Sequence, residues 1–321
     1  MIEYKKVHTA FTLIEVIFVL VILGIIASIA SSLIVKVYES YITQNALYKV
    51  STKTELVANQ IANRLTYAIS SSTISKVTDS NGLWSGDIAE DIGWIQLKNI
   101  MFGHNEFRSI EWIGFDNDSF SASITPGWSG VANYNSSTRN ILNTPASDLT
   151  LSRDIIFNLS DNEVDLNTNN PNSAVIIFRE KNHFYTDISE YSPLCMGLIE
   201  SNNTECVFPV QRNSDTQLKF IDVNKSKIVT ERYKLAWSAY AIVPTDPDGD
   251  NLWDLTLHYN YQPWNGENYN SPTTSKKLLM KNVSVFKFTK NGSIIQFKLC
   301  ASENIGSNFP ISTCKEKVVL R

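Results

Sequence analysis

The sequence predicts an α+β fold in which one long N-terminal helix is followed by a β-rich body. From Phe11 to Val35 the chain is almost wholly apolar, and apolar residues then recur at steps of three and four as far as Ala68. That spacing is typical of a single helix. After residue 70, short runs with alternating or β-branched apolar residues are separated by turn residues, which indicates strands.

Composition supports a folded body and excludes one class of partner. The chain has 321 residues, of which 43% are apolar, so it can bury a sizeable core. Its formal net charge is −4, with acidic and basic residues nearly balanced. We therefore expect no nucleic-acid partner, because such partners require a strongly basic surface.

The N-terminal apolar run has the length of a membrane span. As a helix, residues 11–35 would extend about 37 Å, enough to cross a hydrocarbon core of about 30 Å. Lys5 and Lys6 precede the run, and Lys36 is the only base just after it. This distribution favours a cytoplasmic N-terminus and a body outside the inner membrane.

One charge, Glu15, lies inside this apolar run, and any hypothesis for the run must explain it. A secretory signal peptide also has lysines before an apolar stretch, and Ser28-Ile29-Ala30 is an acceptable cleavage site for it. A plain membrane anchor needs no special residue. Neither explains a carboxylate that costs about 2.5–3.5 kcal/mol at the centre of a span, so Glu15 is expected to have a partner.

The stretch Ala10-Phe11-Thr12-Leu13-Ile14-Glu15, after a short basic leader, resembles the class III signal of type IV pilins and type II secretion pseudopilins. The resemblance implies that a prepilin peptidase cuts between Ala10 and Phe11 and methylates the new amine. It also implies that Glu15 meets the N-terminal amine of a neighbouring subunit during assembly on an inner-membrane platform. That family usually has Gly before the cut, so Ala10 predicts slower processing.

The resemblance also implies an architecture. It predicts a leader over 1–10, a transmembrane half-helix over 11–35, a periplasmic half-helix over 36–70, and a β-rich domain over 71–321. The helix would pack on an antiparallel sheet. Major pilins often carry a proline near the middle of this helix, where the chain has Ser31-Ser32. This difference favours a minor subunit, and the C-terminal strands more weakly resemble those of the J-type minor subunit.

Alternation and β-branched content predict eight strands in the body. Asn291-Gly292 also predicts a tight hairpin. The segment from about 115 to 150 is rich in Ser, Asn, Thr and Gly, so we expect long loops or an insertion there. The predicted strands are Trp94–Ile100, Ala174–Phe178, Gln217–Asp222, Tyr233–Val243, Leu252–Tyr261, Leu278–Phe288, Ser293–Cys300 and Lys317–Leu320.

Four cysteines allow three pairings. In an oxidising compartment we expect the two local ones, Cys195 with Cys206 and Cys300 with Cys314, each contributing up to about 3 kcal/mol. A zinc site is the alternative, but the chain has no Cys-x-x-Cys and no paired histidines near the cysteines.

The loop Thr245-Asp-Pro-Asp-Gly-Asp-Asn-Leu-Trp-Asp254 contains closely spaced carboxylates beside a glycine. Asp246, Asp248, Asp250 and Asp254 are candidate calcium ligands, because calcium prefers several carboxylate oxygens. The alternative is a turn without metal, since Pro-Asp-Gly-Asp is favourable turn chemistry.

Together these observations predict a minor pilin or pseudopilin subunit, with the membrane, other subunits and the prepilin peptidase as partners. It would serve at the tip or in the priming complex of a type IV pilus or a type II secretion pseudopilus. The rival hypothesis is a membrane-anchored extracellular protein that is adhesive or binds calcium. We expect no enzyme, because the four histidines are scattered and lie in no recognised catalytic motif.

Overall fold

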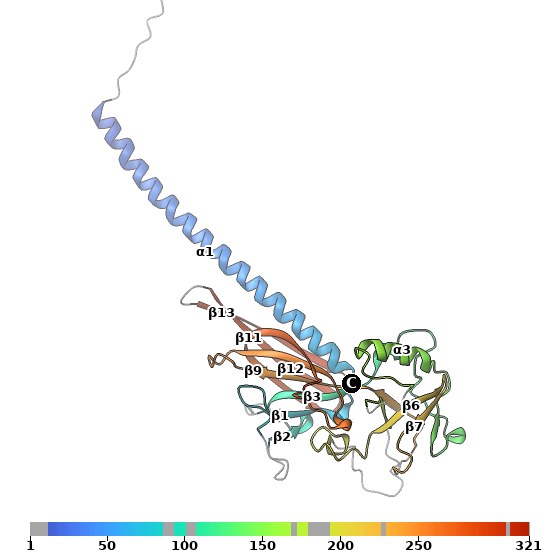
Figure 1. Ribbon diagram of the computed structural model, residues 1–321. Helices are drawn as coiled ribbons and strands as arrows, with labels where there is room; N and C mark the ends of the chain where they lie inside the picture. Colours follow the sequence, from blue (N-terminus) through green and yellow to red (C-terminus); the bar gives the residue numbers. More distant parts are fainter. Residues whose placement is uncertain are drawn as a thin grey trace, which may run out of the picture.

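A computed structural model describes residues 12–85, 93–100, 107–167, 172–178, 193–225, 229–305 and 309–320. Over these ranges a single long helix leads into a body built on two antiparallel sheets (Figure 1). The α+β prediction is confirmed.

The helix, α1 (Leu13–Thr66), is 54 residues long and ends four residues before the predicted limit at residue 70. Its first half projects away from the body, whereas its second half lies along the larger sheet (Figure 1). The buried side chains of α1 begin at Val50 and continue to Leu65 at helical spacing. The amphipathic pattern of the sequence therefore applies to the part of α1 that meets the sheet.

The larger sheet has eight strands in the order β13-β12-β11-β10-β9-β3-β1-β2, and each neighbouring pair is antiparallel. The predicted hairpin is confirmed, since Asn291 pairs with Ile294 and Gly292 has a φ of 56°. The strands are β1 (Ile74–Val77), β2 (Trp94–Gln96), β3 (Phe107–Gly114), β9 (Ser238–Thr245), β10 (Trp253–Tyr261), β11 (Ser275–Asn291), β12 (Ile294–Ile305) and β13 (Phe309–Leu320).

The smaller sheet forms within an excursion from the larger one. Strands β3 and β9 are neighbours in the larger sheet, yet residues 115–237 lie between them in the sequence. The excursion contains five strands in the order β4-β7-β6-β5-β8. The long loops or insertion expected over about 115–150 correspond only to its first part. Its strands are β4 (Ile141–Asn143), β5 (Val175–Phe178), β6 (Phe208–Ser214), β7 (Gln217–Phe220) and β8 (Tyr233–Ala236).

Short helices complete the body. In the excursion, α3 lies beside the smaller sheet (Figure 1). The helices are α2 (Asn117–Phe120) and α3 (Leu149–Leu159), with the 3-10 turns η1 (Ser70–Ser72), η2 (Leu97–Asn99), η3 (Tyr134–Ser136), η4 (Pro193–Met196) and η5 (Pro263–Asn265).

Several of the predicted strands were wrong in extent. Lys317–Leu320 is only the last third of β13. Trp94–Ile100 is a strand only to Gln96, after which η2 turns the chain. Tyr233–Val243 is two strands, because Trp237 interrupts it and the halves join different sheets. The sequence analysis also missed β1, β3, β4, β6 and α3.

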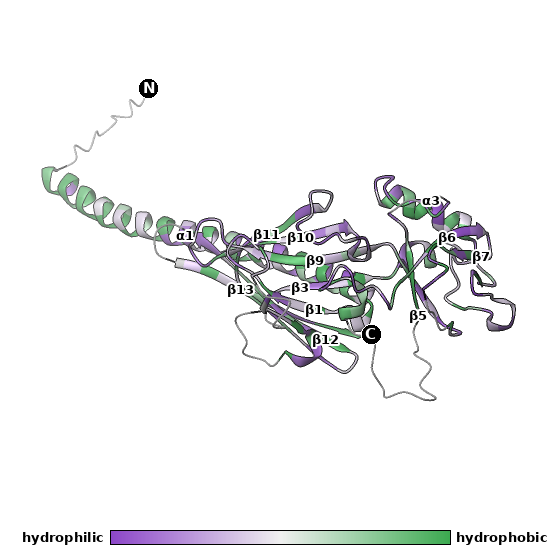
Figure 2. Cartoon of the chain, turned by 60° about the horizontal axis from the view of Figure 1, so that its bottom comes forward, coloured by the Kyte–Doolittle hydropathy of each residue, from purple (hydrophilic) through white to green (hydrophobic). Residues whose placement is uncertain are grey.

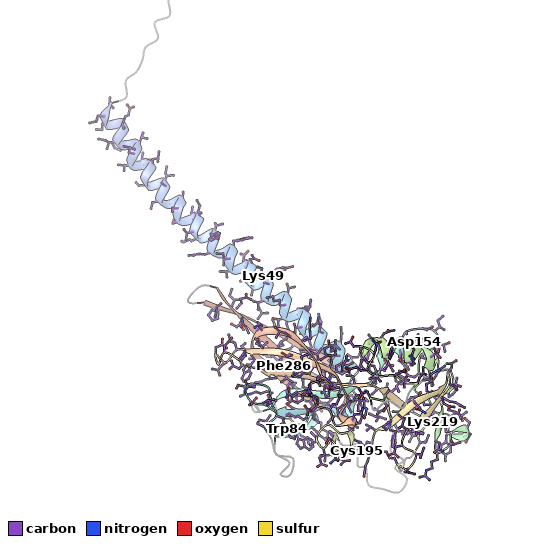
Figure 3. The ribbon with its side chains drawn as sticks, in the orientation of Figure 1. Lys49, Trp84, Asp154, Cys195, Lys219 and Phe286 are labelled. Atoms are coloured by element: carbon purple, nitrogen blue, oxygen red, sulfur yellow. A yellow bond between two sulfur atoms is a disulfide. The ribbon has the colours of Figure 1, made fainter. Side chains whose placement is uncertain are left out.

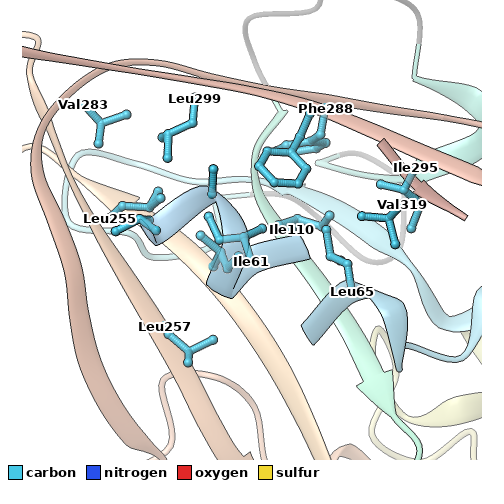
Figure 4. Close-up of a cluster of buried hydrophobic side chains, with 14 of the residues drawn as sticks. Ile61, Leu65, Ile110, Leu255, Leu257, Val283, Phe288, Ile295, Leu299 and Val319 are labelled. Atoms are coloured by element: carbon cyan, nitrogen blue, oxygen red, sulfur yellow. The ribbon is translucent and has the colours of Figure 1, made fainter. Parts of the chain in front are cut away.

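The second half of α1 forms one core with the larger sheet. Ile61 and Leu65 are almost fully buried, and they face side chains from the middle of the sheet (Figure 4). Burying such a side chain contributes about 1.5–3 kcal/mol. The sheet side chains in this cluster include Ile110, Leu255, Leu257, Val283, Phe288, Ile295, Leu299 and Val319.

A second core joins the two sheets. Val175 and Ile177 of β5 pack in one cluster with Ile113 of β3 and with Ala239 and Ala241 of β9. Ile110 and Ile113 of β3 therefore belong to different cores, the first under α1 and the second against the excursion. The larger sheet is thus covered by α1 on one face, whereas on the other face the excursion packs against β3 and β9 and leaves side chains of β13 such as Val318 exposed.

Asp116 is a buried carboxyl group at the start of the excursion, where it caps α2. Its Oδ1 accepts the backbone N–H of Ser119 at 3.2 Å, and its Oδ2 accepts the Ser119 hydroxyl. Burial raises the pKa of Asp116 to about 6, against the opposing effect of the Ser119 hydrogen bonds.

This raised pKa predicts a pH-dependent stability. The folded state holds the Asp116 proton more tightly than the unfolded state. Protonated Asp116 therefore adds up to about 3 kcal/mol to the unfolding free energy below about pH 4, and this contribution is lost as pH rises through about 6. Relative to wild type, an Asp116→Asn variant should therefore gain unfolding free energy between pH 4 and pH 7. Chemical denaturation at both pH values measures this gain, and an equal pH dependence in the two proteins would contradict it.

Candidate functional site

The N-terminal end of α1 is a fully formed helix cap. Thr12 is the cap residue, and its hydroxyl oxygen accepts the Glu15 N–H at 3.4 Å. In return, Glu15 Oε2 accepts the Thr12 N–H at 3.3 Å and lies 3.3 Å from the Thr12 hydroxyl. This reciprocal pair is a capping box. The carboxylate also lies at the positive end of the helix dipole, which favours a negative charge there.

Glu15 is therefore placed at one end of the apolar helix rather than at its middle. The sequence analysis predicted a partner for its charge but missed the local one, although Thr-x-x-Glu before an apolar run is the sequence signature of this cap. The cap leaves the carboxylate exposed, because every residue from Thr12 to Tyr41 is exposed. The remaining acceptor capacity of Glu15 is free for a group from another molecule.

The first half of α1 makes no core contact with the described body. Leu13 is 82% exposed and Ile34 is 69% exposed, and the side chains around this half point outward on all sides (Figure 3). The N-terminal part of α1 is strongly hydrophobic, in contrast to the more polar helix near the sheet (Figure 2). By length and composition, α1 is the helix among the described residues that can cross a membrane.

The second half of α1 is fixed to the body by charge as well as by the core. Glu55 forms ion pairs with Lys317 and, at 3.5 Å, with Lys315, both on the edge strand β13. The hydrogen bond from Lys317 lowers the pKa of the Glu55 carboxyl, with a smaller contribution from Lys315. These contacts, together with the core, set the direction in which the free half of α1 projects.

Ala10 and Phe11, the residues expected at the cleavage and methylation site, lie outside the described residues. Their roles stay predictions.

The structure joins Cys195 to Cys206 and Cys300 to Cys314, which is the local pairing expected from the sequence. Cys300 and Cys314 are directly opposite each other on β12 and β13, so this bond ties the edge strand to its neighbour. Cys195 and Cys206 close the loop that follows η4.

The acidic loop 246–254 is held by its own hydrogen bonds. Asp246 accepts the N–H groups of Gly249 at 2.8 Å and Asn251 at 3.1 Å, and Asp250 accepts that of Leu252 at 2.8 Å. These are the bonds of a turn. Asp254 is instead paired with Lys281, whose Nζ lies 3.1 Å from Asp254 Oδ2.

These contacts do not gather the four carboxylates of the loop. Across the described ranges, no group of three or more His, Cys, Asp or Glu side chains is placed to hold one metal ion. Calcium binding by Asp246, Asp248, Asp250 and Asp254 stays a prediction.

The sequence analysis missed a buried ion pair in the larger sheet. Lys76 on β1 lies 2.7 Å from Glu111 on β3, and both side chains are at most 3% exposed. Lys76 also donates to the Leu198 carbonyl at 2.9 Å, while Tyr261 donates its hydroxyl to Glu111 at 2.8 Å. The available signal was a single charge inside each of two apolar segments, Ile-Ser-Lys-Val and Ile-Glu-Trp-Ile.

Comparison with known families gives a match at the N-terminus. Residues 5–31 match a family model described as the prokaryotic N-terminal methylation motif. The chain therefore carries a type IV pilin-like prepilin signal, as the sequence analysis predicted. Searches of curated proteins and of solved structures each found no match to the chain.

Proposed function

We propose that the protein is a minor subunit of a pilin-type filament, either a type IV pilus or a type II secretion pseudopilus. The observation that carries this proposal is the first half of α1, an apolar helix that none of the described residues of the body covers, with a carboxylate at its N-terminal end. Such a helix can be stored in the membrane and later packed against the helices of other subunits.

In this proposal the prepilin peptidase removes residues 1–10 and methylates Phe11. The span enters the inner membrane with its N-terminus in the cytoplasm and its body in the periplasm. During assembly Glu15 accepts hydrogen bonds from the N-terminal amine of a neighbouring subunit. The amine is a new charge created by the cut, so assembly would depend on processing.

Within the filament system, the proposed position of the subunit is the tip or the priming complex, where the exposed body contacts other subunits and the assembly platform. The absence of a helix-breaking residue at Ser31-Ser32 and the resemblance of the last strands to the J-type subunit support it. The N-terminal methylation motif favours a structural subunit over an enzyme.

Mass analysis of the mature N-terminus tests the proposal. In cells with an active prepilin peptidase we expect a chain that begins at a methylated Phe11, and in cells lacking that enzyme the intact leader. An Ala10→Gly variant should be processed faster, because Gly is the residue that the family usually has there. An intact Met1 in peptidase-positive cells, or a start at Ser31, would overturn the proposal.

A further inference from the structure

Seven asparagines of the chain stand two positions before a Ser or Thr with no proline between, which is the pattern of an N-glycosylation acceptor. Two of them, Asn202 and Asn224, also have an acidic residue two positions before the asparagine. This longer pattern, acid-x-Asn-x-Ser/Thr, resembles the acceptor of bacterial N-glycosylation. The five that lack the acid are Asn117, Asn135, Asn158, Asn282 and Asn291.

The acceptor pattern around Asn202 lies on an exposed turn. Its acid, Glu200, and the asparagine itself are both exposed. The N–H of Asn203 donates to the Glu200 carbonyl at 3.0 Å, which closes a four-residue turn with Asn202 near its tip. The turn therefore presents the carboxylate and the acceptor amide on the surface of the body.

The base of this turn is fixed to the excursion. The Cys195–Cys206 disulfide closes the loop that carries the turn. Lys225 donates from its Nζ to the carbonyls of Thr204 and, at 2.6 Å, of Val207. The loop is thus held at its base, so the tip can carry a large group without disturbing the core.

The hydroxyl that the pattern requires belongs to Thr204, which is half-buried and lies two residues after Asn202. Its Oγ1 is 3.5 Å from Lys225 Nζ. Asn224 belongs to the same region, because it is the neighbour of Lys225 in the sequence. The hydroxyl that would serve Asn224 is on Ser226, which lies outside the described residues, so the acceptor at Asn202 is the one described in full.

The position of the loop leaves α1 free for other contacts. Cys195, at the start of the loop, lies far from the first half of α1, on the opposite side of the body (Figure 3). A group attached at Asn202 would therefore not meet the helix surface that is proposed to pack against other subunits.

We propose that Asn202 is an acceptor site for an N-linked oligosaccharide, supplied by an oligosaccharyltransferase from a polyprenyl-diphosphate-linked donor. In this transfer Asn202 Nδ2 forms a bond to the anomeric carbon of the sugar, and the bond from that carbon to the phosphate oxygen breaks. The polyprenyl diphosphate leaves, and one amide proton passes to a base of the transferase. The modification would occur outside the cytoplasm, where the proposed function places the body.

A reaction with purified components tests this site. The full chain in detergent is incubated with a bacterial oligosaccharyltransferase of the acid-dependent type and its lipid-linked oligosaccharide. Trypsin then releases residues 182–212, which contain Asn202, in one peptide, whereas Asn224 falls in another. We expect the peptide 182–212 to gain the mass of one oligosaccharide. Because no filament is needed, a negative result here is distinguishable from a failure of the proposed function.

Three variants test the pattern. Asn202→Gln and Thr204→Val should each abolish the mass gain, the first by removing the acceptor amide and the second by removing the hydroxyl. Val has nearly the shape of Thr, and Lys225 keeps both of its carbonyl contacts, so the turn should be retained. Glu200→Gln should also abolish the gain, because it removes the acid and keeps the size of the side chain.

Asn135 is a matched control within the same chain. It is exposed and has a Ser two positions later, but no acid precedes it, so it should stay unmodified. An unmodified peptide 182–212 in a reaction that fully modifies an acceptor peptide with the acidic pattern would overturn the proposal. So would a mass gain that survives Thr204→Val. Equal modification of Asn135 would overturn the assignment to Asn202, because the acid would then select nothing.

Discussion

A Glu15→Gln variant is expected to enter filaments about ten- to a hundredfold less often than wild type, with normal expression and membrane insertion. The reason is the contact proposed between the Glu15 carboxylate and the amine of a neighbouring subunit. Hydrogen bonds to charged groups contribute about 1.5–3 kcal/mol, and each 1.4 kcal/mol is a factor of ten in an equilibrium. Quantitative blotting of sheared filaments against the membrane fraction measures the ratio.

The Gln substitution distinguishes the effect of the Glu15 charge on assembly from its effect on the helix cap. In the structure Glu15 completes a capping box with Thr12, and Gln can take the same position in such a box. Glu15→Gln therefore removes the charge and keeps the cap, whereas Glu15→Ala removes both. If the cap alone matters, the Gln variant should assemble like wild type, and the proposed contact would be contradicted.

Glu39→Gln provides the matched control. Glu39 is also an exposed carboxylate on α1, but it lies beyond the apolar run. We expect its variant to assemble at the wild-type level. A similar loss in both variants would show that the overall charge of α1 matters rather than the position of Glu15.

The features that the sequence predicted correctly depend on local pattern. The spacing of apolar residues predicts α1, and the pair Asn291-Gly292 predicts the hairpin between β11 and β12. Both signals act over a few residues. The Thr12–Glu15 cap was equally local. It was missed because Glu15 was interpreted only as a contact for another molecule.

The excursion was predicted incompletely for a different reason. Its strands are three to seven residues long, and the pairing of β3 with β9 spans more than a hundred residues of sequence. Nothing in a short window shows that Gly114 pairs with Ser238.

Removing one partner of the buried pair Lys76–Glu111 is expected to give the largest loss of stability of any change considered for the body. A Lys76→Met variant should lose about 3–5 kcal/mol of unfolding free energy, because it leaves the Glu111 carboxylate buried with no opposite charge. Denaturant unfolding of the full chain in detergent, followed by tryptophan fluorescence, measures the loss.

The double variant Lys76→Met/Glu111→Gln tests the cause. Gln keeps an oxygen to accept the Tyr261 hydroxyl, and Met fills much of the volume of the lysine stem. Since no unpaired charge is left, the double variant should be more stable than Lys76→Met alone, although it carries more changes. A double variant that is as unstable as the sum of its two single variants would show that packing, not the buried charge, causes the loss.

The pair Lys298–Glu316 on β12 and β13 is an exposed control for these measurements. Its Nζ and Oε1 atoms are 3.0 Å apart, close to the spacing of the buried pair, but the two side chains are 43% and 71% exposed. Water and salt screen exposed pairs, so Lys298→Met should change the unfolding free energy by less than about 1 kcal/mol. The contrast arises because water can solvate Glu316 once its partner is gone. Glu111 is buried, and among the hydrogen bonds of the described residues the Tyr261 hydroxyl is the one that would remain to offset its charge.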